Sequence, residues 1–158
     1  MITRSQMSRA LRRYRLTGPS DAVPIVAALA CGASADSTGV DLVIVDRRGR
    51  LMALVNLVDA DEAQVPELAS IVAQGVPRPR WGLLVVSRRP EVPDDIPELE
   101  LAWEEACTAA RRHRLVLLDW IVVAAGRFAF SVAEFTPSRP AWSMGLDAAG
   151  RTAGSFRR

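Results

Sequence analysis

The sequence predicts an α/β domain in which a mixed sheet is covered by helices on its faces. Short apolar runs rich in Val, Ile and Leu alternate with longer segments whose apolar residues recur at helical spacing. The chain has 158 residues, of which 49% are hydrophobic, so it can bury one core without disulfides or metals. The predicted order is helix, hairpin, helix, strand, helix, hairpin, and periodicity alone does not order the strands.

The first half of the chain predicts a helix, a β-hairpin and a second helix. Ser20 can cap the first helix, which the glycine-containing stretch 32–39 closes. The hairpin pairs 40–45 with 51–58 across turn residues 46–49. Pro66 opens the second helix, because a first-turn proline costs no hydrogen bond. The residues expected on the apolar faces are Val23, Val26, Ala27 and Ala30 in the first helix and Leu68, Ile71 and Val72 in the second.

The second half predicts a buried strand, a helix and a final hairpin. Residues 81–86 form the strand, and the proline-rich segment 87–97 forms a loop. The helix that follows has glutamates near its start and arginines at its end, as the helix dipole favours. Residues 115–123 and 128–134 form the last two strands. The apolar stripe of the helix is Leu99, Ala102, Trp103, Ala106 and Ala110.

Three segments are expected along the chain: an arginine-rich arm over 1–19, the domain over 20–135, and a tail rich in Gly, Ser and Arg over 136–158. The sequence has no secretion signal and no apolar run long enough for a membrane helix, so we expect a cytoplasmic protein without membrane contact. Cys31 and Cys107 have no partner at metal or redox spacing.

Several strings resemble the RadC branch of the JAB/MPN proteins. Residues 117–123, Leu-Leu-Asp-Trp-Ile-Val-Val, are similar to the family pattern Leu-Leu-Asp-His-Ile-Ile-Val, and 126–131 follow as the family's Gly-Arg-Tyr and Phe-Ser elements do. Val-Ile-Val-Asp at 43–46 resembles the family's Leu-Leu-Leu-Asp, and Val-Pro-Glu at 65–67 falls where the family often has His-Pro-Arg-Glu. The resemblance covers roughly 20–134 and implies the three-layer, cytidine-deaminase-like JAB/MPN fold.

The resemblance also implies that the family's metal site has degenerated. The family motif is His-x-His-Pro with an aspartate in the next helix, whereas Ser87 and Arg89 stand at the histidine positions here. The third ligand position falls on Leu99 or Glu100, and strand 51–58 offers no glutamate as general base. We therefore expect no catalytic residue, no metal and no cofactor, which favours a protein that is not an enzyme.

The residue types also predict that there is no metal site, independently of the resemblance. The nitrogen and sulfur ligands of the whole chain are Cys31, Cys107 and His113. Cys107 and His113 are six positions apart, about 240° round a helix, and therefore on different faces. A zinc site is not expected from three isolated ligands.

Three functions remain open. The first is an interaction or scaffold module, with a protein partner or self-association, whose groove the apolar tail residues could occupy. The second is nucleic-acid binding through terminal arginines, although the net charge of +2 predicts only weak binding. The third is anion binding at Arg88 and Arg89, which could instead pair with Glu91, Asp94 or Asp95. The terminal arginines concerned are Arg4, Arg9, Arg12, Arg13 and Arg15, and the tail residues are Trp142, Met144, Leu146 and Phe156.

Overall fold

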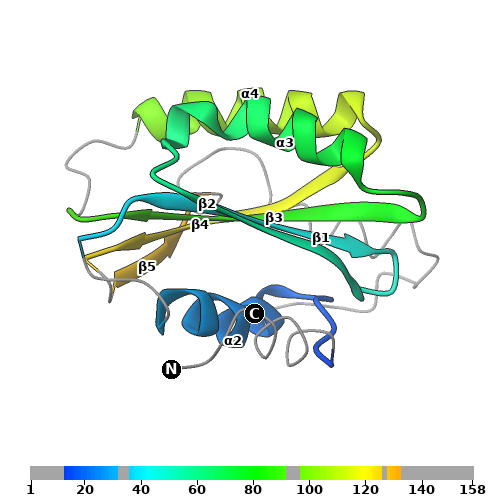
Figure 1. Cartoon of the computed structure of the whole chain (residues 1–158), viewed down its shortest axis with the longest axis horizontal. Helices are drawn as coiled ribbons and strands as arrows, with labels where there is room; N and C mark the ends of the chain where they lie inside the picture. The colour runs from blue at the N-terminus through cyan, green and yellow to red at the C-terminus, as the bar shows by residue number, and fades with distance from the viewer. Residues whose placement is uncertain (1–12, 32–35, 92–96, 126–127, 133–158) are drawn as a thin grey trace, which may run out of the picture.

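A mixed sheet lies between two layers of helices, as the sequence predicts. The computed structural model describes residues 13–31, 36–91, 97–125 and 128–132. Helix α2 covers one face of the sheet, and α3 and α4 lie side by side on the other (Figure 1). None of the helices in these ranges combines the length and apolar composition that a membrane crossing requires. The helices are α2 (Pro19–Cys31), α3 (Val65–Gly75) and α4 (Pro97–Arg112), with a short 3-10 helix η1 (Glu62–Gln64) before α3.

The described part of the sheet has five strands in the order β2-β1-β3-β4-β5. β1 is antiparallel to both of its neighbours, β3 and β4 are parallel, and β5 returns antiparallel to β4. Parallel neighbours need a crossover connection, and α4 supplies it between β3 and β4. This order leaves β2 and β5 at the two edges. The strands are β1 (Gly39–Asp46), β2 (Leu51–Val58), β3 (Arg80–Arg89), β4 (Val116–Ala124) and β5 (Phe128–Ser131).

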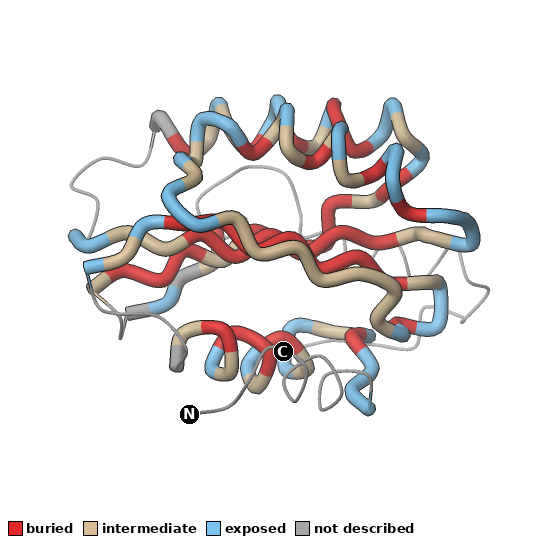
Figure 2. Tube along the Cα trace, in the orientation of Figure 1, coloured by how far each residue is buried: buried red, intermediate tan, exposed pale blue. Residues whose placement is uncertain are grey.

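Each face of the sheet has its own core because successive strand residues point to opposite faces. In β3, Leu83 and Val85 pack under α3 and α4, whereas Leu84 and Val86 pack on α2. Figure 2 shows buried residues along the central strands and on the helix sides that face them. The core under α3 and α4 includes two tryptophans, Trp103 and Trp120.

The structure corrects the buried face of α2. Val23, expected in the core, is 66% exposed. The helix begins at Pro19, so Ser20 lies inside its first turn, and Asp21 accepts hydrogen bonds from the Thr17 backbone N–H and hydroxyl. The segment is apolar almost throughout, so helical spacing fits more than one face and contact with the sheet decides between them. The buried residues are Ala22, Ile25, Val26 and Leu29.

The two helices on the other face agree with the prediction to different extents. In α3, Ile71 is 57% exposed and was wrongly expected in the core, while Ala69 and Ala73 are buried. Small alanines let the helix approach the sheet and α4 closely. In α4 the predicted stripe is confirmed, with Ala102 partly buried and the rest fully buried: Leu99, Trp103, Ala106 and Ala110.

Two boundaries differ from the sequence prediction. β3 runs on to Arg89, three residues past the expected end, because its parallel pairing with β4 continues to Ala124. At the other end of the molecule, Leu16 is 2% exposed and its N–H donates to the Gly49 carbonyl, so packing begins before Ser20. The remainder of the expected arm, 1–12, and the tail from 136 lie outside the described residues.

Candidate functional site

The degenerate motif lies at the carboxyl end of β3. Because side chains alternate along a strand, Ser87 and Arg89 point to the α3/α4 side and Arg88 points to the α2 side. The three consecutive residues therefore belong to two separate polar clusters, one on each face of the sheet.

The Glu62 cluster, on the α3/α4 side, consists of Glu62, Ser87, Arg89 and Trp120. The Ser87 hydroxyl donates to Glu62 Oε1 at 2.8 Å and accepts from Trp120 Nε1 at 3.0 Å. Arg89 Nη1 lies 3.3 Å from Glu62 Oε2. A capping box between Asp61 and Gln64 fixes η1 and thereby holds Glu62 over the end of β3.

The polar groups of this cluster are engaged with one another. Ser87 is fully buried, and its one hydroxyl proton is donated to the Glu62 carboxylate. Glu62 uses one oxygen for Ser87 and the other for Arg89. Within the described residues, no group of three or more His, Cys, Asp or Glu side chains could hold a metal ion. These contacts connect β3, β4 and η1, so the cluster stabilises the fold.

The other two degenerate positions lie apart from this cluster. Leu99 is 4% exposed and packs in the core under α4. Glu100 is the next residue of α4 and is partly exposed. Among the described residues, no hydrogen bond or ion pair joins Glu100 to Ser87 or Arg89. The structure thus brings together two of the four sequence-predicted positions.

The Asp41 cluster, on the α2 side, consists of Asp41, Asn56 and Arg88. Asp41 is fully buried, and its Oδ1 accepts from Asn56 Nδ2 at 2.5 Å. Arg88 Nη2 lies 3.5 Å from Asp41 Oδ2, with 10% of the Arg88 side chain exposed. Strand register explains these contacts, because Asn56 is directly opposite Asp41 and Arg88 is its diagonal neighbour across β1 and β3.

Gly39 makes room for this arginine. It pairs directly with Arg88 in the ladder between β1 and β3. A Cβ atom at position 39 would lie 2.5 Å from Arg88 Nη2 and 2.8 Å from the Leu57 carbonyl oxygen. Because Gly39 has no side chain, the Arg88 guanidinium can lie over this position of β1 and reach Asp41.

The sequence did not identify the partners of the two arginines. Both were considered with the nearby acidic residues 91, 94 and 95, whereas the structure pairs Arg88 with Asp41 and Arg89 with Glu62. Asp41 could have been recognised from the sequence as one member of an ion pair. It is a carboxylate inside an otherwise apolar strand, and a buried charge requires a partner. Glu62 had no comparable signal, since it lies four residues beyond the end of β2.

A third polar contact fixes the last strand. The Ser131 hydroxyl donates to Asp119 Oδ1 at 2.6 Å, and the Trp120 backbone N–H donates to the same oxygen at 2.7 Å. Asp119 is 6% exposed. This aspartate, which belongs to the string that resembles RadC, joins β4 to the short strand β5.

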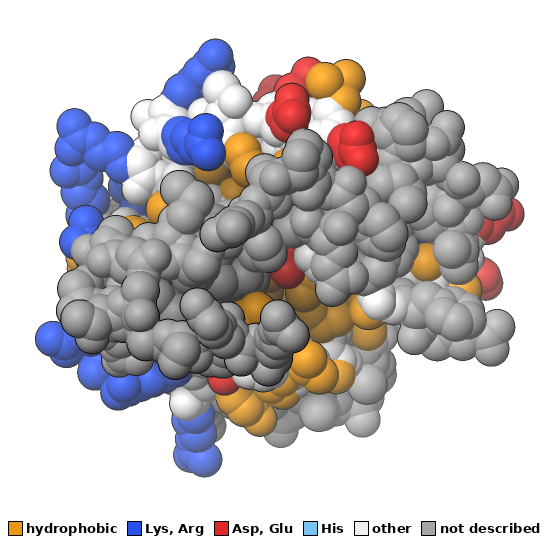
Figure 3. All heavy atoms as spheres, turned by 180° about the vertical axis from the view of Figure 1, so that it is seen from behind, with side chains coloured by type: hydrophobic (Ala, Val, Ile, Leu, Met, Phe, Trp, Pro, Cys, Tyr) orange, Lys and Arg blue, Asp and Glu red, His pale blue; other side chains and the backbone are white. Residues whose placement is uncertain are grey.

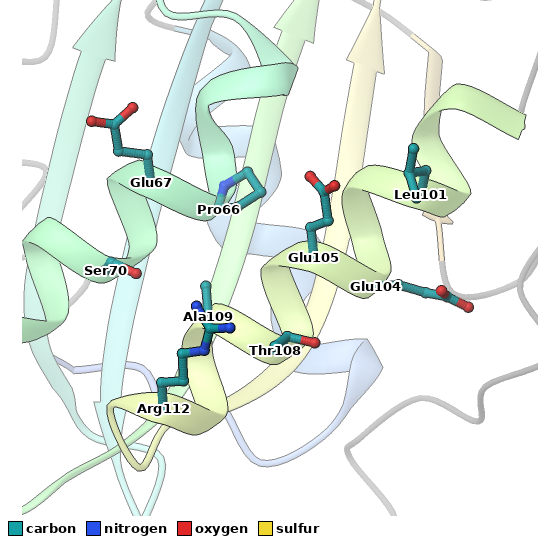
Figure 4. A pocket seen from close by; sticks show the side chains of 9 residues that line it. All are labelled: Pro66, Glu67, Ser70, Leu101, Glu104, Glu105, Thr108, Ala109 and Arg112. Atoms are coloured by element: carbon teal, nitrogen blue, oxygen red, sulfur yellow. The ribbon is translucent and has the colours of Figure 1, made fainter.

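A separate groove lies on the outer surface between α3 and α4. It has a volume of about 490 Å³, and Pro66, Glu67 and Leu101 are among its lining residues. Figure 4 shows Glu105 beside Pro66 between the helices, while Glu104 points away from α3. The layer of helices separates this groove from the sheet and from the Glu62 cluster.

Within the described residues, Cys107 and His113 belong to no group of side chains that could hold a metal ion. Cys107 is a free, partly buried thiol that packs against the core under α4. Burial raises its pKa to about 11, against the opposing effect of Arg111, so it is a protonated thiol at neutral pH. His113 directly follows α4, and its backbone N–H donates to the Ala110 carbonyl.

Comparison with known proteins adds no family. No protein-family model matches the chain, and a search of curated proteins gives no match. The resemblance to RadC therefore continues to rest on the strings quoted above.

Proposed function

We propose that this chain is a non-catalytic JAB/MPN domain, similar to RadC, that acts as an interaction module. Two features of the fold support the proposal. The helices and strands follow the order helix, hairpin, helix, strand, helix, hairpin, and they form three layers around a mixed sheet. The observation that carries the proposal is the Glu62 cluster, in which Ser87 and Arg89 stand at the two positions where the resemblance places the histidine ligands.

The chemistry of this cluster opposes metal binding. A guanidinium stays protonated, offers only donors, and repels a cation. Arg89 also pairs with Glu62, the one carboxylate at the cluster, and Ser87 donates to that same carboxylate. A zinc ion would have to break both interactions and would gain a hydroxyl and a carboxylate, which are too few ligands.

The test is elemental analysis of protein purified without a metal-affinity tag. We expect no stoichiometric zinc and no chelator-sensitive isopeptidase activity. One equivalent of zinc, or activity that a chelator removes, would overturn the proposal. The double variant Ser87→His and Arg89→His serves as the comparison, because it supplies two ligands. We expect it to remain inactive, since β2 contains no general base for the metal-bound water.

The edge strand β2 offers a surface for interaction. Its sequence, Leu-Met-Ala-Leu-Val-Asn-Leu-Val, has no charged residue and no proline, which are the usual protections of an exposed edge. In Figure 2 this strand crosses in front of the buried strands and is only partly buried along most of its length. Val58 at its end is 63% exposed. We propose a second copy of the chain as the partner.

Ladder geometry identifies which backbone groups face outward. The Asp59 N–H donates to the Thr38 carbonyl, so residues of the same parity in β2, such as Val55 and Leu57, direct their backbone groups to β1. The N–H and C=O groups of Leu54 and Val58 then point away from the sheet. Antiparallel pairing of two β2 strands would satisfy these groups and would place one α3 beside the other.

A proline at Val58 tests this pairing. Its N–H points outward, so Val58→Pro removes a donor for the partner without removing a bond to β1. Each lost hydrogen bond costs about 1 kcal/mol and a two-fold interface loses two, so the dissociation constant should rise roughly thirtyfold. Sedimentation equilibrium measures this, with Val58→Thr as the control. A monomeric wild-type protein at all concentrations would exclude self-association and leave the zinc result unaffected.

A further inference from the structure

The fold gathers exposed arginines at one end of the sheet. Strand register shows how, because Val45 pairs with Leu51 and Asp46 pairs with Arg80 at the end where β4 also begins. The β1–β2 turn, the start of β3 and the end of α4 therefore meet there. The bridge between Arg15 and Arg50 brings the N-terminal segment to the same end. The nine exposed arginines of this arginine end are Arg13, Arg15, Arg47, Arg48, Arg50, Arg78, Arg111, Arg112 and Arg114.

Among the described residues, few acidic side chains lie at the arginine end. Asp46 and Asp21 lie there, and both are occupied, Asp46 with the N–H groups of Arg48 and Arg50 and Asp21 with Thr17. No ion pair between described residues involves any of the nine arginines. In Figure 3 the basic side chains gather along the left of the molecule, whereas acidic side chains lie mainly at its top and right. The exposed acidic residues of the opposite end are Asp36, Asp59, Asp61 and Glu91.

Local roles explain only part of this distribution. Arg111 and Arg112 lie in the last turn of α4, where positive charge stabilises the helix dipole. The turn arginines Arg47 and Arg48 have no such role, because the Asp46 side chain holds the turn through backbone N–H groups. Both side chains are exposed, and within the described residues no ion pair involves them.

We infer that the arginine end binds the phosphate backbone of a nucleic acid. A guanidinium matches the geometry of a phosphate and can donate two parallel hydrogen bonds to it. Four strands about 4.8 Å apart and helix layers about 10 Å from the sheet spread the arginines over roughly 15 by 20 Å. A duplex carries one charge per about 1.7 Å of axis, so several phosphates face a surface of this size. This activity is independent of the proposed interaction module.

The site differs from the one that the sequence suggested. The candidate arginines predicted from the sequence lie in the N-terminal arm, and of these Arg13 and Arg15 are described and belong to the arginine end. The other seven come from the β1–β2 turn, the start of β3 and the end of α4, and they become neighbours only in the folded chain. Contacts to phosphates carry no information about the bases, so we expect the affinity to depend little on the nucleotide sequence.

Fluorescence anisotropy with a short labelled DNA duplex tests the inference over a range of salt. If four to six phosphates are contacted, the slope of log affinity against log salt should be about −4 to −5, and affinity should fall a few hundredfold between about 50 and 200 mM. The variant Arg47→Gln with Arg48→Gln should reduce that slope by about 2 and weaken binding at low salt. Thermal melting of the variant establishes that it is folded.

A matched variant separates local contacts from net charge. Thr38→Glu with Gln64→Glu lowers the charge by the same amount at the opposite end, and glutamate at 64 preserves the capping box. Its salt slope should equal that of the wild type. Absence of binding at low salt, an equal loss in both variants, or equally tight binding to polyglutamate or anionic vesicles would each overturn the inference.

Discussion

Replacing Asp41 with alanine is expected to destabilise the domain by about 3–5 kcal/mol, because it leaves the guanidinium of Arg88 buried without its partner carboxylate. The environment supports this magnitude, since Asp41 is fully buried and only 10% of the Arg88 side chain is exposed. Asn56 would lose its acceptor as well. Urea unfolding followed by circular dichroism measures the change in the free energy of unfolding.

The control is a double variant that removes both charges. Asp41→Leu with Arg88→Met replaces the ion pair with apolar groups, so it should recover most of the stability that Asp41→Ala loses. A cost below about 1 kcal/mol for Asp41→Ala would contradict the prediction, because solvent or another group would then satisfy the arginine. Comparing the single and the double variant separates two free energies: the cost of leaving one buried charge unpaired, and the net contribution of the ion pair to stability.

Local patterns predicted most of the secondary structure. The hairpin of β1 and β2 and the stripe of α4 follow from alternation and helical spacing, which depend only on neighbouring residues. The face of α2 did not follow, because a helix that is apolar almost all round does not define one face. Exposure of Val23 and burial of Ile25 result from contact with the sheet.

The candidate site was predictable only in part, because its contacts join distant segments. Alternation alone places Ser87 and Arg89 on the same face of a strand, and the structure agrees. Their common partner, Glu62, precedes Ser87 by 25 residues and is positioned by η1. The sequence predicted that the charged residues at the end of β3 belong to a loop. In the structure they remain in the strand, because ion pairs on both faces of the sheet neutralise them.

The adjacent residues Arg88 and Arg89 show how this end of the sheet is held. Arg88 crosses Gly39 to Asp41 and so ties β3 to β1 on the α2 side. Arg89 ties β3 to η1 on the other side. The resemblance would place a spacer at Arg88 and a metal ligand at Arg89. In this chain both residues instead connect β3 to its neighbours through ion pairs. Such a role requires that both guanidinium groups stay engaged, which also disfavours the binding of a free anion there.

Trp120 connects the Glu62 cluster to the core, and its removal is expected to have an effect as large as that of Asp41→Ala. The side chain is fully buried, and its Nε1 donates to the Ser87 hydroxyl. Trp120→Ala should destabilise the domain by about 3–5 kcal/mol, because it leaves a large cavity under α4.

Trp120→Phe separates packing from hydrogen bonding. Phenylalanine keeps most of the apolar contact but lacks the donor to Ser87, so the cost should be about 1–2 kcal/mol. Chemical denaturation measures both variants, and in the background Ser87→Ala the phenylalanine substitution should cost less, because the hydroxyl that needs the donor is gone. Equal costs of Trp120→Phe in the two backgrounds would show that the indole acts by packing alone. A smaller cost with Ser87→Ala would establish that Trp120 and Ser87 are coupled, as their hydrogen bond indicates.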